Sequence, residues 1–333
     1  MTAIQTCQPR HQQQHQQQYQ PGTDQAYRQR IQVVLDYIEE HLDDAFTDSL
    51  CLDQLADLAG FSIYHFHRIF RAYVGIPLAA YIRRLRFDRA ARHLLETDWG
   101  VIDIALEAGY GTHSSFTKAF RQQFGVTPSQ FRAMSRQVNH MGDRSADRYV
   151  QRTPNLFEAQ EAFMSQSTIT AEIVTLPDTR VLYTRATEVM NGNAFQSANE
   201  QAFGQLMQFM QANDLQFGKW RQIVAVYPED VQSGQESIFD AGLIFNDTFD
   251  TTSLGDVEAG GMNWHTLPSG RWAKFVHKGP YSTLWQTWNA IYRDWLPSSG
   301  ETLRSAAGWE DYVNDPSETP PEELLSELYI AIE

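Results

Sequence analysis

Two groups of polar side chains recur at helical spacing, and their chemistry suits the edges of base pairs. The first group follows an i, i+3, i+4, i+7 pattern and consists of Tyr64, His67, Arg68 and Arg71. The second group lies about 50 residues further along and consists of His113, Ser114, Thr117, Lys118 and Arg121. Side chains at this spacing share one stripe of a helix, where hydroxyl, imidazole, ammonium and guanidinium groups hydrogen-bond to bases and phosphates. The sequence therefore predicts two DNA-reading helices.

The elements that would position the first stripe form a helix-turn-helix pattern. A short helix over residues 52–58 presents apolar side chains to a core, and Gly60 provides a tight turn in which a β-carbon would be strained. The following helix is expected to bury Phe66 and Ile69 and to turn its polar stripe outward. Ser62 is expected to cap this helix, because its hydroxyl can accept a hydrogen bond from a free amide of the first turn.

The second stripe has the same setting. Gly109 turns the chain ahead of a helix that is expected to bury Phe116, Phe120 and Phe124. The short helix before the turn is expected to pack through Ile102, Ile104, Ala105 and Ala108. Residues 77–96 predict a connecting helix that would hold the two reading helices about 34 Å apart, one turn of DNA. Its arginines are candidates for phosphate contacts, or else solvated charges: Arg83, Arg84, Arg86 and Arg89.

Charge is divided unevenly along the chain. The whole chain carries −15, yet residues 60–137 hold 11 Lys and Arg against 5 Asp and Glu. Residues 168–333 hold 9 Lys and Arg against 23 Asp and Glu. A basic segment suits nucleic acid and an acidic one attracts cations, although either can simply be a solvated surface. The asymmetry favours two domains with different partners.

The sequence is expected to divide into four parts. Residues 1–25 are a Gln- and His-rich tail that predicts disorder, 26–137 a helical DNA-binding domain, 138–167 a linker and 168–333 a second domain. Only two cysteines occur, and the first residues hold no apolar run, so a secretory leader is not expected. No run of about 18 apolar residues is found in the sequence. These features predict a cytoplasmic protein that has no membrane segment, no metal site and no cofactor.

The second domain is expected to be α+β. Its strand-like runs, rich in β-branched and aromatic residues, are 168–174, 180–186, 222–227, 241–246, 271–277 and 327–332. Two helical patterns interrupt these runs, one around Phe203 and one around Trp288. The phrase Thr-Leu-Pro-x-x-Arg begins at Thr175 and again at Thr266, each time ahead of a strand. This repeat predicts two strand-helix-strand units about a pseudo-twofold axis.

Residues 27–137 closely resemble the DNA-binding domain of the AraC/XylS family of transcription regulators. The matching stretches are LADLAGFSIYHFHRIFRAYVGIPLAAYIRRLRFDRAARHLL and IALEAGYGTHSSFTKAFRQQFGVTPSQFR. In that family two recognition helices enter adjacent major grooves of promoter or operator DNA. The resemblance therefore assigns base reading to Tyr64, His67, Arg68, His113, Ser114, Thr117 and Lys118. It also implies a monomer on an asymmetric site and makes RNA polymerase a further candidate partner.

Residues 168–333 resemble the GyrI-like effector-binding domain, which follows the DNA-binding domain in the Rob branch of the AraC family. The stretches that carry this resemblance are HKGPYSTLWQTWNAIYRDWL, GWEDYVNDP and SELYIAI. The resemblance implies a ligand cavity between the two repeats with a buried carboxylate, which matches Glu310. The candidate wall residues are Tyr227, Trp264, Tyr281, Trp309 and Tyr312. Glu327 is a second candidate carboxylate or the polar side of an edge strand, and Trp288 is expected to be core.

Together these features predict a sequence-specific DNA-binding transcription regulator that responds to a small hydrophobic effector, with a cation as the first candidate. Two alternatives stay open for the acidic domain: it binds a protein partner, or it has GyrI-like hydrolase activity with Glu310 as general base. The sequence holds no Ser-His-Asp order, metal-ligand cluster or phosphate loop. No catalytic residue is therefore assigned, and the protein is not expected to be an enzyme.

Overall fold

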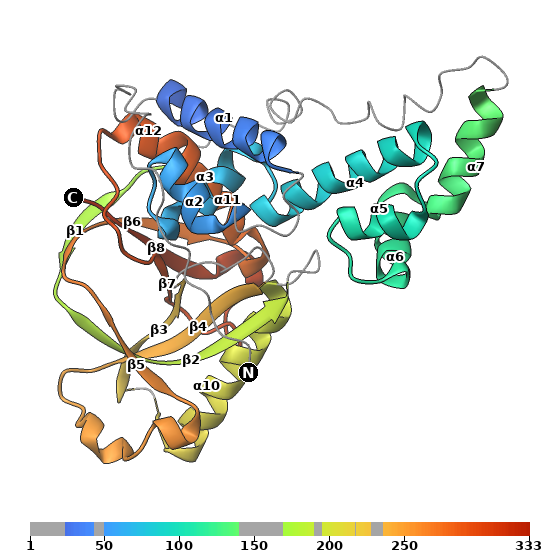
Figure 1. Ribbon diagram of the computed structural model, residues 1–333. Coiled ribbons are helices and arrows are strands. Elements are labelled where there is room, and N and C mark those ends of the chain that lie inside the picture. Colours follow the sequence, from blue (N-terminus) through green and yellow to red (C-terminus); the bar gives the residue numbers. More distant parts are fainter. Residues whose placement is uncertain (1–23, 43–49, 140–168, 190–194, 217, 228–235) are drawn as a thin grey trace.

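The structure is a computed structural model that describes residues 24–42, 50–139, 169–189, 195–216, 218–227 and 236–333 (Figure 1). The predicted disordered tail and the predicted linker thus lie almost entirely outside the described residues. Among the described residues, none of the helices combines the length and the apolar character needed to cross a bilayer.

The N-terminal half is all helical, as predicted. Its helices are α1 (Asp24–Glu40), α2 (Leu52–Ala59), α3 (Ile63–Val74), α4 (Leu78–Glu96), α5 (Val101–Glu107), α6 (His113–Phe124) and α7 (Pro128–Asn139). Two helix-turn-helix units, α2–α3 and α5–α6, are joined by α4. The turns are made at Gly60, with φ of 66°, and at Gly109, with φ of 84°. Both values lie in the left-handed region, where glycine avoids the strain of a β-carbon.

Two local expectations are corrected. Ser62 occupies the N-cap of α3, but its hydroxyl makes no capping bond, and no described group hydrogen-bonds to it. The corresponding Thr112 does cap α6, because its Oγ1 accepts a hydrogen bond from the Ser115 amide at 3.2 Å. Ile102 is 57% exposed rather than packed, since the core of this unit is reached by Ile104 and Ala105.

The C-terminal half is built on one antiparallel sheet of eight strands. The strands are β1 (Glu172–Leu176), β2 (Thr179–Val189), β3 (Trp220–Val226), β4 (Glu236–Phe245), β5 (Asn263–Leu267), β6 (Gly270–Lys278), β7 (Trp309–Tyr312) and β8 (Leu325–Ala331). The helices are α10 (Phe195–Ala212), α11 (Leu284–Ala290), the π-helical turn η7 (Ile291–Trp295) and α12 (Leu296–Ser299). Short 3₁₀ turns are η4 (Thr251–Leu254), η5 (Glu258–Gly260), η6 (Tyr281–Thr283) and η8 (Pro321–Glu323).

The strand order confirms the predicted pseudo-twofold repeat. It runs β1-β6-β8-β7-β3-β4-β2-β5. If β1 to β4 are exchanged with β5 to β8 in turn, the same order is obtained in the reverse direction, as a twofold axis requires. The axis passes between β3 and β7, which pair at the centre of the sheet and come from different units. The short first strand of each unit pairs with the second strand of the other unit, β1 with β6 and β5 with β2. The strands β5 and β7 were not among the predicted runs, because they have only five and four residues and each holds several polar side chains.

The first helix-turn-helix unit packs directly on the C-terminal half. Helix α3 lies against α11 and η7, and α1 contacts α12. One apolar core therefore runs from Phe66 and Ile69 to Trp288 and Ile291. The second unit has its own core around Phe87, with Phe116, Phe120 and Phe131. It stands apart at the far end of α4 (Figure 1).

Candidate functional site

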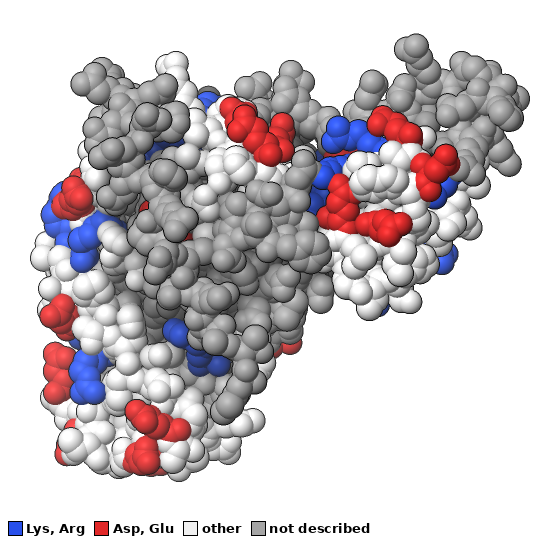
Figure 2. Space-filling model, in the orientation of Figure 1, with Lys and Arg blue, Asp and Glu red and all other residues white. Residues whose placement is uncertain are grey.

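The second predicted reading stripe lies on the solvent side of α6. His113, Ser114, Lys118 and Arg121 are exposed and Thr117 is half-buried, while Phe116 and Phe120 hold the opposite face of the helix in the core. On the face drawn in Figure 2, Lys and Arg alternate with Asp and Glu over this lobe. The exposed side chains make the α6 stripe accessible to a DNA groove.

The first predicted reading stripe is covered. Tyr64, His67, Arg68 and Arg71 are all half-buried, because the polar face of α3 lies against the C-terminal half. Tyr64 packs on the cluster that contains Trp272 and Trp309. The stripe points away from the core of its own helix-turn-helix unit, as expected, but the expectation that it faces solvent is wrong in this arrangement.

His65 fixes α3 to the C-terminal half. It is 1% exposed, and its Nδ1 lies 2.9 Å from the Tyr292 hydroxyl and its Nε2 3.0 Å from the Arg304 carbonyl oxygen. A carbonyl only accepts, so Nε2 carries the proton and Nδ1 accepts from the tyrosine. Burial lowers the pKa of His65 to about 4, with smaller lowering from Arg68 and His67 and a raising effect from the bond to Arg304.

Arg68 reaches from α3 into an aromatic corner between the two repeats. Its guanidinium carbon lies 3.8 Å from the ring centroid of Trp288 and 4.2 Å from that of Tyr227. The two rings meet at 81°, with centroids 6.1 Å apart. Trp288 comes from α11 of the second repeat and Tyr227 directly follows β3 of the first. The guanidinium therefore makes cation–π contacts with both repeats at once.

Glu310 lies beneath this corner, next to the pseudo-twofold axis. It is on β7, paired with Ala225 of β3, and it is 1% exposed. Its Oε1 accepts a hydrogen bond from the Trp288 indole at 2.5 Å and its Oε2 accepts one from the Tyr312 hydroxyl at 2.8 Å. Burial, followed by the nearby charge of Glu310, raises the pKa of Tyr312, which keeps that hydroxyl a donor. Within the described part of the chain, no cationic side chain forms an ion pair with Glu310.

Three of the expected wall residues gather around this carboxylate. Tyr312 bonds to it directly, and the Tyr281 ring stands 5.0 Å from the Tyr312 ring, edge to face. Tyr227 contacts Trp288 and, on its other side, Phe239. These side chains form one aromatic cluster with Glu310 at its base.

The other expected wall residues lie elsewhere. Trp309 is adjacent to Glu310 in the strand and so faces the opposite side of the sheet, where it stacks on Tyr329 with centroids 3.9 Å apart. Trp264, on β5, lies under Arg180, whose guanidinium carbon is 4.1 Å from the ring centroid. The Trp264 ring meets that of Phe245 with centroids 6.1 Å apart, in the apolar cluster against which Tyr227 and Tyr312 also pack. Trp264 therefore borders the same cluster as two of the wall residues, whereas Trp309 lies across the sheet from Glu310.

Glu327 is also accounted for by structural contacts. It lies on β8, which is between β6 and β7 and is not an edge strand. One oxygen is 3.2 Å from the Lys274 ammonium and the other accepts a hydrogen bond from Tyr329 at 2.6 Å. Neither expectation for Glu327, a cavity carboxylate or an edge-strand polar residue, is needed to explain it.

Two participants were missed by sequence reasoning. Trp288 was expected only as core, and it is indeed 6% exposed, but it also donates to Glu310 and stacks on Arg68. Phe203 of α10 adds a further wall, with its ring centroid 5.5 Å from that of Tyr312. The indole and ring contacts depend on strands that meet across the axis, so residue type alone could not single these positions out. Over the described residues, His, Cys, Asp and Glu form no cluster of three suited to a metal.

Comparison with known proteins agrees with this two-part architecture. The GyrI-like small molecule binding domain family matches residues 170–333, and a helix-turn-helix domain family matches residues 55–134. The regulatory protein SoxS of Salmonella typhimurium is 35% identical over 107 residues, which are 32% of this chain and 96% of SoxS. The chain belongs to the AraC family of transcription regulators.

Other AraC-type relatives match over the same length of chain. The transcriptional regulator Rob of Salmonella typhimurium is 37% identical over 105 residues, 32% of this chain and 35% of Rob. The bifunctional transcriptional activator/DNA repair enzyme AdaA of Bacillus subtilis is 38% identical over 102 residues, 31% of this chain and 48% of AdaA. The chain thus spans less than half the length of these two proteins, and the AdaA match is confined to the helix-turn-helix region.

Proposed function

We propose that this AraC-type regulator reads DNA through the stripes of α6 and α3 and is controlled by an aromatic cation that binds above Glu310. The observation that carries the proposal is a buried carboxylate with two neutral hydrogen-bond donors, no ion pair among the described residues, and aromatic rings around it. The GyrI-like match over residues 170–333 supports a small molecule as the ligand.

The charge balance of this cluster favours a cation. A buried carboxylate is costly unless it is paired or well hydrogen-bonded. Trp288 and Tyr312 satisfy one lone pair on each oxygen of Glu310, yet neither brings a positive charge. A cation stacked on the rings would supply that charge, and each desolvated ring adds about 0.5–2 kcal/mol.

The two alternative roles of the domain are less well supported. A general base must contact the water that it activates, whereas Glu310 is 1% exposed and both of its oxygens already accept hydrogen bonds from Trp288 and Tyr312. SoxS and Rob, which match about a third of the chain, are named as regulators, in keeping with a regulatory role for the DNA-binding half. A protein partner does not require a carboxylate at the base of an aromatic cluster, so it leaves the main feature of the site unexplained.

Thermal unfolding of the full chain with a pair of matched ions tests the proposal. Tetraphenylphosphonium and tetraphenylborate have nearly the same shape and opposite charge. The phosphonium ion at 100 times its Kd should stabilise the fold by about 2.7 kcal/mol, and the borate should not. Glu310→Gln should remove this stabilisation, because the amide can still accept from Trp288 but carries no charge.

Glu322→Gln is the control, since Glu322 is exposed and lies outside the cluster. It loses the same charge and should keep the full response. Equal stabilisation by both ions, or a response that persists in Glu310→Gln, would show that the cation does not bind above Glu310.

A further inference from the structure

We propose that Arg68 is a built-in occupant of the cation site, so that α3 cannot read DNA while it is docked and an effector cannot bind until α3 leaves. This inference rests on the proposed function, because it assumes that a cation binds above Glu310. It adds a mechanism by which binding of the cation changes the DNA affinity of the N-terminal half.

The position of Arg68 is that of a ligand. Its guanidinium carbon lies 3.8 Å and 4.2 Å from the centroids of the Trp288 and Tyr227 rings. The Trp288 indole that carries one of these contacts also donates to Glu310. The Arg68 guanidinium is thus stacked on the same Trp288 ring that donates a hydrogen bond to the buried Glu310 carboxylate. Any other cation seated in this corner would have to displace it.

The rest of α3 is held in the matching orientation. His65 bonds to Tyr292 and to the Arg304 carbonyl, and Tyr64 packs on the Trp272 and Trp309 cluster. Within the described residues the α6 stripe has no contact with the C-terminal half, and all of its side chains except Thr117 are exposed. The two stripes derive from equivalent positions in two equivalent motifs, so the difference in exposure comes from docking alone.

Docking gives the molecule two mutually exclusive states. In the closed state Arg68 lies between the repeats, and its helix face is unavailable to a major groove. In the open state α3 is free for DNA and the aromatic corner is free for a cation. Both ligands therefore select the open state, and each must raise the affinity of the other by the same factor.

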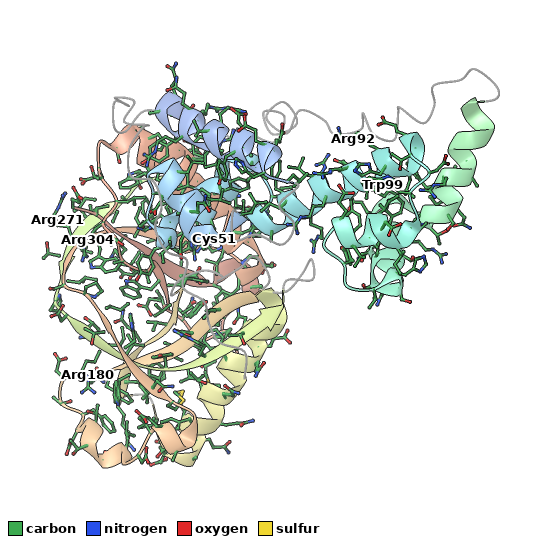
Figure 3. The ribbon with its side chains drawn as sticks, in the orientation of Figure 1. Cys51, Arg92, Trp99, Arg180, Arg271 and Arg304 are labelled. Atoms are coloured by element: carbon green, nitrogen blue, oxygen red, sulfur yellow. The ribbon has the colours of Figure 1, made fainter. Side chains whose placement is uncertain are left out.

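Calorimetric titration of tetraphenylphosphonium into the full chain and into Arg68→Gln tests the competition. The apparent Kd of the parent is the intrinsic Kd divided by the fraction of open molecules. Removal of the occupant should therefore tighten binding by about five-fold or more. Arg92→Gln is the matched control, because Arg92 is exposed on α4, apart from the C-terminal half (Figure 3). It should bind the cation as the parent does.

A second variant loosens docking without touching Arg68 or Glu310. Tyr292→Phe removes the hydroxyl that donates to His65. Loss of one hydrogen bond should favour the open state by about three- to ten-fold. The affinity for the cation, and the affinity for a duplex selected by the parent protein, should rise by the same factor.

The outcomes separate this inference from the function on which it rests. Equal cation affinity in the parent and in Arg68→Gln would overturn the inference and leave the effector site standing. Weaker binding by Arg68→Gln would also overturn it, since Arg68 would then be part of the binding site. Binding by neither protein would refute the effector site itself, and the inference with it.

Discussion

At the scale of single residues, burial determines which charge a side chain carries. His65 is enclosed by Tyr292 and the Arg304 backbone, with Arg68 and His67 on its own helix, and burial lowers its pKa to about 4. It is therefore neutral when α3 is docked. A released histidine has a pKa near about 6.5. The docked state gains stability from this difference at pH values above about 6.5, and loses it progressively as the pH falls toward about 4.

We expect the free energy of unfolding to reflect this titration. Between pH 7 and pH 5 the parent should lose about 2 kcal/mol through His65 alone, because the unfolded chain takes up the proton that the folded chain excludes. His65→Gln should lack this component and show a shallower pH dependence in urea unfolding. His113→Gln, which removes an exposed histidine, should retain it. Parallel pH profiles for the parent and His65→Gln would contradict the assignment.

At the scale of elements, two helices of the same design have different surroundings. Both α3 and α6 follow a left-handed glycine turn, bury phenylalanines on one face and carry polar residues on the other. Only α6 presents that polar face to solvent. The first contact with DNA is therefore expected through α6, and that of α3 requires its release.

Lys118→Ala should weaken DNA binding in the closed protein as well as in the open one. Lys118 is exposed on α6, and loss of a base-edge contact costs about 1–3 kcal/mol, or roughly 5- to 150-fold in affinity. Fluorescence anisotropy with a selected duplex at fixed salt measures this change. Lys278→Ala makes the same substitution at an exposed position of β6 and should bind like the parent. An unchanged affinity in Lys118→Ala would place the base contacts on other residues.

At the scale of the whole molecule, the hydrophobic cores do not coincide with the sequence motifs. The core of α1–α3 continues into α11, η7 and the sheet, whereas α5–α7 and the second half of α4 enclose a separate core. A shared core couples the opening of the elements that build it. The DNA-binding half is thus expected to open in two parts, not as one.

Hydrogen exchange in increasing denaturant should reveal this division. Amides of α1–α3 should open together with those of α11, and amides of α5–α7 should open separately with a different free energy. Tyr292→Phe should lower the opening free energy of the first set and leave the second unchanged, because the Tyr292 hydroxyl bonds to His65 of α3. Joint opening of α1–α3 with α5–α7 would show that the helix-turn-helix motifs form one unit.

Much of the molecule could be predicted from local pattern. The two glycine turns, the alternating faces of α3 and α6, and the repeated Thr-Leu-Pro-x-x-Arg phrase are local features, and each led to an element or symmetry that the structure contains. Strand β7 escaped prediction, because only four residues form it and two of them are acidic. The choice of Glu310 as the buried carboxylate came from resemblance to a family, not from periodicity.

The sequence by itself determined which helix faces are apolar and where the chain turns, since these depend on neighbours within one or two turns. It also determined that the second half consists of two repeated units, because the Thr-Leu-Pro-x-x-Arg phrase occurs twice. Only the tertiary structure decided that Arg68 lies on Trp288 and Tyr227 and not in solvent. Arg68 is more than 150 positions from each of the two rings in the chain, and its contact with them arises from the docking of one apolar surface on another. An arginine at that helical position can contact a phosphate, a base or an aromatic ring, so the packing of the two halves determines which of these it contacts.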